Sequence, residues 1–86
     1  MAEVRLPGAL TTLFPGTPRR LTLAGGTVRE VIAALDAQAP GSRDRLVAGG
    51  AIREHIKLFV DGDLATLDTP VGPSSLVQVV LAVSGG

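Results

Sequence analysis

The stretch TVREVIAAL, residues 27–35, decides the fold. Thr27 stands three residues before Glu30, the spacing of a capping box, in which each side chain bonds the other residue's free backbone N–H at a helix start. The apolar residues that follow recur at i, i+3, i+4 and i+7 and form one stripe: Val28, Val31, Ile32 and Leu35. Pro40-Gly41 ends the pattern. The stretch therefore predicts an amphipathic helix with one buried face.

Two short alternating segments precede this helix. Residues 4–6 alternate apolar and polar side chains, which predicts a first strand that ends at Pro7-Gly8. Residues 9–19 are interpreted as a loop, because prolines and a glycine interrupt them. Residues 20–23 alternate again and are followed by Gly25-Gly26. The two strands are predicted to form a hairpin joined by that loop.

The sequence after the helix contains two stronger strand signals. Residues 56–60 are rich in β-branched and aromatic side chains and precede an Asp61-Gly62 turn. Residues 76–83 form a nearly unbroken apolar run of strand length. Between these elements the pattern is weaker: residues 43–47 suit one helical turn, and residues 64–67 suit a short strand or a turn.

This order of elements predicts an α+β fold of the β-grasp type, a mixed sheet wrapped around one main helix. The last strand would lie centrally beside the first, which would let it be apolar on both faces. A plain sandwich of helix on sheet also fits the pattern. We expect residues 1–82 to form the domain and residues 83–86 a flexible tail. The helix stripe should pack against Leu21, Leu23, Leu58, Val60, Val77 and Val79.

The length and amino-acid composition of the chain argue against several classes of function. A chain of 86 residues accommodates one domain. Its 8 basic and 8 acidic residues balance, and no stretch concentrates the basic residues as a nucleic-acid site would require, so nucleic-acid binding is not expected. Without Cys, and with His55 as the single His, the chain has little material for catalysis or metal binding. We expect a protein that is not itself an enzyme and binds no cofactor or metal. The absence of a long apolar run or a signal-like N-terminus indicates the cytoplasm.

The sequence closes on Val83-Ser84-Gly85-Gly86, directly after the last predicted strand. A glycine pair has no Cβ, so it fits a channel too narrow for other residues. A C-terminal carboxylate is ionised at neutral pH and can attack the α-phosphate of ATP. Four extended residues reach about 13 Å, enough to enter another protein's active site. We interpret the tail as a substrate, although the same residues also suit an ordinary flexible terminus.

Residues 76–86, LVQVVLAVSGG, resemble the closing segment of the ubiquitin-like sulfur carriers. This family includes the small subunit of molybdopterin synthase, the thiamine-pathway carrier and the cysteine-biosynthesis carrier. The resemblance extends to residues 27–35 after Gly25-Gly26 and to residues 56–62. The opening VRLPGAL, residues 4–10, is more similar to the cysteine-biosynthesis carrier.

The resemblance implies a specific chemistry at Gly85 and Gly86. A separate activating enzyme of the E1-like type would adenylate the Gly86 carboxylate with ATP and Mg²⁺, and a sulfur donor would convert it to a thiocarboxylate. A downstream enzyme would then use the sulfur to make cysteine, molybdopterin, thiamine or another sulfur-containing metabolite. Two alternatives stay open: a modifier joined through Gly86 to lysines of other proteins, and a β-grasp interaction module whose Gly-Gly ending is incidental.

Strand alternation also predicts a partner surface. If Leu58 and Val60 face the core, Phe59 points to the opposite side of the sheet. Ubiquitin-like proteins, which the chain resembles, dock their activating enzymes through such a face. The predicted docking residues are Phe59, Gln78, Val80, Val83 and Ser84. Loops could instead cover this face. Two basic clusters, Arg19-Arg20 and residues 43–45, are interpreted as solvated, and either could provide charge complementarity to an activating enzyme.

Overall fold

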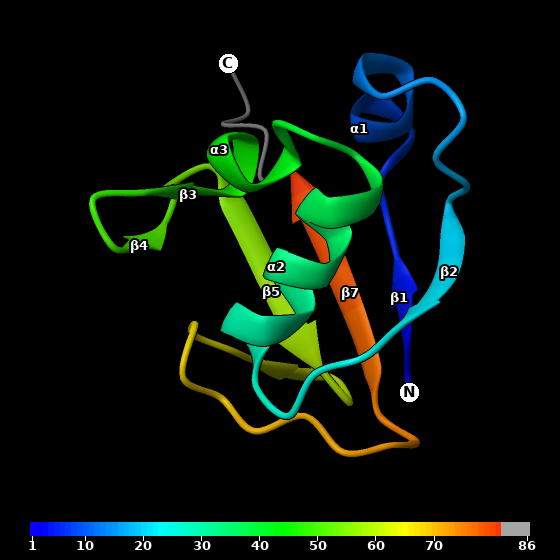
Figure 1. Ribbon diagram of the computed structural model, residues 1–86. Helices are drawn as coiled ribbons and strands as arrows, with labels where there is room; N and C mark the ends of the chain where they lie inside the picture. The colour runs from blue at the N-terminus through cyan, green and yellow to red at the C-terminus, as the bar shows by residue number, and fades with distance from the viewer. Residues whose placement is uncertain (82–86) are drawn as a thin grey trace.

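A five-stranded sheet with the strand order β2-β1-β7-β5-β6 forms the body of the protein (Figure 1). The computed structural model describes residues 1–81. The strands of this sheet are β1 (Ala2–Arg5), β2 (Arg20–Leu23), β5 (Ile56–Val60), β6 (Asp63–Leu64) and β7 (Leu76–Leu81). The last strand, β7, lies at the centre, parallel to β1 on one side and antiparallel to β5 on the other. The parallel pairing of the first and last strands distinguishes the β-grasp arrangement from a plain sandwich and confirms the predicted fold.

Helix α2 (Val28–Gln38) lies across one face of the sheet and supplies its buried stripe. Val28, Val31, Ile32 and Leu35 are each 3% exposed or less, as their spacing predicts. At the start of α2 the Glu30 N–H donates to Thr27 Oγ1 at 3.3 Å. The Glu30 carboxylate accepts from the Gly26 N–H at 2.7 Å rather than from that of Thr27, so the reciprocal half of the capping box is displaced by one residue.

The hydrophobic core lies between α2 and the sheet. Of the side chains predicted opposite the helix stripe, most are buried: Leu23, Leu58, Val60, Val77 and Val79. Leu21 is only partly buried, because β2 is the edge strand of the sheet. Residues from the start of the chain, including Ala2, Val4 and Leu6, complete the core.

The predicted loop over residues 9–19 is partly wrong, because helix α1 (Gly8–Leu13) occupies its first half. The prolines and the glycine that suggested a loop come after this helix, at residues 15, 16 and 18. Leu10 is the buried anchor of α1 and is 4% exposed. Thr11 and Thr12 donate from their hydroxyl groups to the Gly8 carbonyl, and Leu10 is the only buried residue of the helix.

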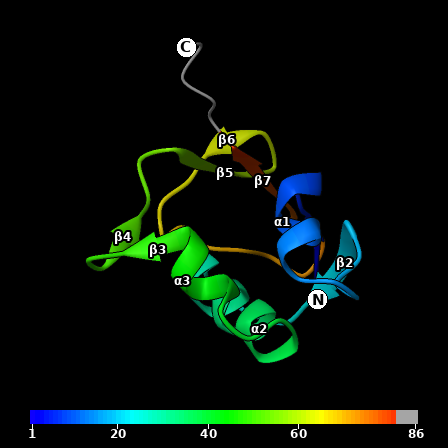
Figure 2. The same cartoon turned by 90° about the horizontal axis from the view of Figure 1, so that it is seen from above.

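A second departure is a small hairpin of β3 (Val47–Ala48) and β4 (Ala51–Ile52), which the sequence reading did not predict. Gly49-Gly50 form its turn with φ angles of 60° and 78°, a left-handed conformation that glycine adopts without strain. Helix α3 (Ser42–Leu46) confirms the expected helical turn before it. Figure 2 shows α3 and α2 together on one side of the molecule. Within residues 1–81, no helix is long and apolar enough to cross a membrane.

Candidate functional site

Strand β7 carries the chain to residue 82 and is held by its neighbours along its length. Hydrogen bonds at its start fix its position: Leu76 N–H donates to Asp61 Oδ1 at 2.9 Å, and Asp61 N–H donates to the Leu76 carbonyl at 2.9 Å. At its other end Leu81 is paired with Ile56 of β5. The point from which residues 82–86 continue is therefore fixed to the centre of the sheet.

Several predicted site residues lie outside the described part of the chain. These are the reactive pair, Gly85 and Gly86, and two of the predicted docking residues, Val83 and Ser84. The structure places the other three, Phe59, Gln78 and Val80.

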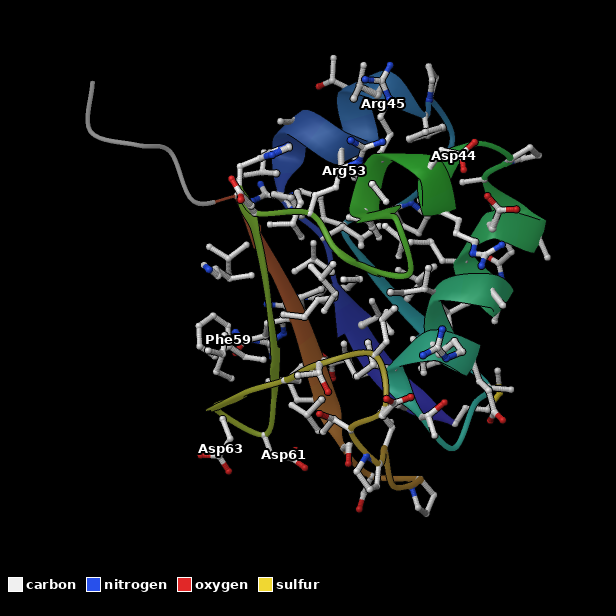
Figure 3. The ribbon with its side chains drawn as sticks, turned by 90° about the vertical axis from the view of Figure 1, so that its left-hand side faces the viewer. Asp44, Arg45, Arg53, Phe59, Asp61 and Asp63 are labelled. Atoms are coloured by element: carbon white, nitrogen blue, oxygen red, sulfur yellow. The ribbon has the colours of Figure 1, made fainter. Side chains whose placement is uncertain are left out.

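These three side chains lie on the face of the sheet opposite α2, here called the outer face. Val77 and Val79 are 1% and 6% exposed, whereas Val80 is 43% exposed and Gln78 is half-buried. Phe59 is paired directly with Gln78, so their side chains are neighbours on the outer face. Figure 3 shows Phe59 projecting away from the helices. Although β7 is central, its outer face is not fully covered, which departs from the expectation that its position would bury both faces.

The sequence reading missed one prominent member of this surface, Leu64. It is 66% exposed and is paired with Phe59 across the β5–β6 hairpin. The two-residue turn Asp61-Gly62 sets this register, and both residues have the positive φ angles that such a turn requires, 52° and 89°. That turn was visible in the sequence and could have identified Leu64. We call Phe59, Leu64, Leu76 and Val80 the outer patch.

Charged residues lie beside the patch. Lys57 is paired with Val80, and both are exposed. His55 is exposed. Within the part of the chain that the structure describes, no group of three or more His, Cys, Asp or Glu residues could hold a metal ion. The geometry suits binding of another protein.

Comparisons with known proteins agree with this geometry. A sequence model of the ThiS family matches residues 5–86. No curated protein matches the chain significantly.

Three solved structures share the fold. A chain from the Amycolatopsis orientalis BexX/CysO complex superposes with a TM-score of 0.91 at 24% identity, covering 100% of both chains. Mycobacterium tuberculosis CysO, an antigen, superposes with a TM-score of 0.88 at 22% identity, covering 96% of this chain and 100% of that chain. SAMP1 from Haloferax volcanii gives 0.77 at 25% identity, covering 99% of this chain and 98% of that chain. Two of these three matches come from structures that contain CysO, and at their identities they show a shared fold.

Proposed function

Because the chain belongs to the ThiS family, as the match over residues 5–86 shows, we propose that it is a sulfur carrier whose reactive group is the Gly86 carboxylate. The observation that carries this proposal is the extent of the match, which runs through Gly85-Gly86. The ubiquitin-like β-grasp fold supports it, because β7 fixes the start of the tail while the body stays outside a partner's active site.

The proposed chemistry has two steps. A carboxylate oxygen of Gly86 attacks the α-phosphorus of ATP, which forms an acyl-adenylate and releases pyrophosphate. A sulfide-level donor then attacks the acyl carbon, which releases AMP and leaves a thiocarboxylate. The activating enzyme supplies the ATP and Mg²⁺, and this chain acts as a protein co-substrate. Because the sequence contains no Cys, the sulfur is held at the terminus and not on an internal thiol.

The partners in this proposal are an E1-like activating and sulfur-transfer enzyme and a downstream biosynthetic enzyme that accepts the sulfur. In the BexX/CysO complex, CysO is assembled with a second protein, which supports a carrier that works by docking. We assign the docking role to the outer patch together with Gln78, and we extend it along Val83 and Ser84 to the tail. The cytoplasm, where ATP is available to the activating enzyme, is the proposed location.

The residues after Leu81 give the tail a defined reach. Five residues follow it in the sequence, and a fully extended chain of that length spans about 17 Å. This distance lets the carboxylate reach a nucleotide in a partner's active site while the outer patch contacts the partner's surface. A shorter tail would bring the body against the nucleotide site.

Exchange of labelled pyrophosphate into ATP by the activating enzyme tests the first step. The full-length chain should support exchange, because adenylation is reversible, and a chain without Gly86 should not. If an unrelated protein that ends in Gly-Gly also supports exchange, the folded body of the carrier contributes nothing to recognition by the activating enzyme. Equal exchange with and without Gly86 would contradict the proposal.

A second candidate function, protein modification through Gly86, is favoured by one observation. SAMP1 from Haloferax volcanii, a small archaeal modifier protein, shares 25% identity and the fold. Both functions begin with the same acyl-adenylate, and they diverge when a lysine amine rather than sulfide attacks it. Recovery of lysine-linked conjugates from cells, with no thiocarboxylate on the free protein, would select the modifier function.

A further inference from the structure

A continuous row of side chains crosses the outer face and uses all five strands of the sheet. The strand registers pair Arg20 with Arg5, Arg5 with Gln78, Gln78 with Phe59, and Phe59 with Leu64. Directly paired residues project from the same face of a sheet, so these five side chains are successive neighbours. The row is basic on β2 and β1, polar on β7, and apolar on β5 and β6. The outer patch is therefore one half of a larger two-sided surface.

The basic half contains a surface hollow lined by Arg5, Leu6, Arg19 and Arg20. Arg5 is partly compensated, because its Nε donates to Glu3 Oε2 at 2.8 Å. Arg19 and Arg20 are exposed, and neither takes part in the ion pairs found within residues 1–81. Guanidinium groups bind carboxylates through two parallel hydrogen bonds. The hollow therefore offers two free cationic groups to a carboxylate ligand.

The hollow lies beside the middle of β7. Strand β1 runs parallel to β7, and Arg5, its last residue, is level with Gln78. The Leu6 N–H donates to the Arg19 carbonyl at 2.8 Å, which holds the Arg19 backbone at the same end of the sheet. Asp61 and Asp63 lie at the opposite end, as Figure 3 shows. A ligand in the hollow would thus contact the body beside the middle of β7, farther along the strand toward the tail than the Asp61-Gly62 turn.

We infer that the hollow of Arg5, Arg19 and Arg20 binds an acidic segment of the enzyme that processes the tail, while the outer patch contacts an apolar surface of that enzyme. This inference rests on the proposed function and names the chemistry of its partner. The carrier surface is basic on one side and apolar on the other. A partner with the complementary surface can therefore bind it in only one rotational orientation about the tail. The two halves together therefore orient the carrier as well as hold it.

A protein fits this surface better than a nucleic acid. A phosphate backbone needs several uncompensated cations in a row, whereas Arg5 is ion-paired with Glu3 and the row turns apolar at Phe59. The formal net charge of zero also gives no general attraction to a polyanion. Carboxylates on a folded partner provide separate charges that can be placed opposite Arg19 and Arg20.

Steady-state kinetics of carrier activation by the activating enzyme test this inference. We compare Arg19→Glu combined with Arg20→Glu against Arg43→Glu combined with Arg45→Glu, a matched control on α3 with the same change in charge and equally exposed positions. At about 0.05 M salt the first variant should raise the KM for the carrier about tenfold with kcat within about twofold, and the control should raise it less than about threefold. The difference should shrink at about 0.5 M salt. Arg19→Lys with Arg20→Lys should recover part of the loss.

The outcomes distinguish a failure of the proposed function from a failure of the inference about the hollow. If the wild-type chain is not activated at all, the proposed function fails. If the wild type is activated and the KM for the carrier rises equally in both Glu variants, or in neither, the hollow has no specific role and the inference is overturned. Circular dichroism of each variant checks that the fold is intact. If the first variant loses retention on single-stranded RNA but keeps normal activation kinetics, the hollow serves a nucleic acid and the inference is also overturned.

Discussion

Gly25 sits where the chain leaves β2 and turns toward α2. Its φ angle is 149°, and a Cβ built at this position would lie 2.8 Å from the Val31 nitrogen. Both the conformation and the contact exclude other residues, so we expect Gly25→Ala to lower the free energy of unfolding by about 1–3 kcal/mol. Urea denaturation measures the change.

The neighbouring Gly26 provides the matched control for that substitution. A Cβ at Gly26 would approach only the Glu30 carboxylate, at 3.5 Å, which is ordinary contact. Gly26→Ala should therefore change the free energy of unfolding by less than about 1 kcal/mol. Equal losses in the two variants would show that the close approach to α2 is not what requires glycine.

At the residue scale, the sequence predicted the alternation of the strands but not every consequence of it. Phe59, Gln78 and Val80 were placed on the correct face because alternation in a strand is local. Leu64 was missed because its partner depends on the register across a turn. The requirement at Gly25 depends on Val31, six residues along, and appears only when α2 is placed against the chain.

Among the elements, α2 is the one on which the core depends. Ile32 is 3% exposed on its buried stripe, so Ile32→Ala should leave a cavity and lower the free energy of unfolding by about 2–5 kcal/mol. Val80→Ala, on the exposed face of β7, removes a similar amount of side chain and should cost less than about 1 kcal/mol. Thermal denaturation followed by circular dichroism compares the two. An Ile32→Ala protein that melts like the wild type would contradict the core assignment.

The outer faces of β5 and β7 form the predicted docking surface. Phe59→Ala, or Val80→Asp, should weaken binding to the activating enzyme about tenfold or more while the fold stays intact. Leu13→Asp is the matched control, because Leu13 is 51% exposed on α1, away from this face. Isothermal titration calorimetry measures the affinities. Unchanged binding in both patch variants would place the docking surface elsewhere.

At the element scale, prediction succeeded where the pattern was long or flanked by clear turns. Helix α2 and strands β5 and β7 have periodic apolar residues, caps or turns of their own. Helix α1 was missed because it has only six residues and because prolines and a glycine follow it closely at residues 15, 16 and 18. The β3–β4 hairpin has two residues in each strand, too few to show alternation. Such elements are stabilised by contacts with the rest of the molecule.

For the whole molecule, the sequence predicted the topology because the most apolar strand comes last and must lie at the centre. It predicted Arg19-Arg20 as a basic cluster but not that Arg5 would lie beside it. The 8 cations are scattered along the chain, yet folding brings Arg5 and Arg20 into register on adjacent strands. Pairing between residues 15 positions apart cannot be read from local composition. The addition of Arg5 to the Arg19-Arg20 cluster is therefore a consequence of the fold.

Intact mass spectrometry detects whether the Gly86 carboxylate becomes a thiocarboxylate. The purified chain is incubated with its activating enzyme, Mg-ATP and a sulfide source. Replacement of one oxygen by sulfur should add about 16 Da, and deletion of Gly86 should abolish the gain, because the carboxylate then stops about 3.5 Å short of the nucleotide. A full-length chain that acquires an adenylate but never gains sulfur, or a gain that survives deletion of Gly86, would contradict the account.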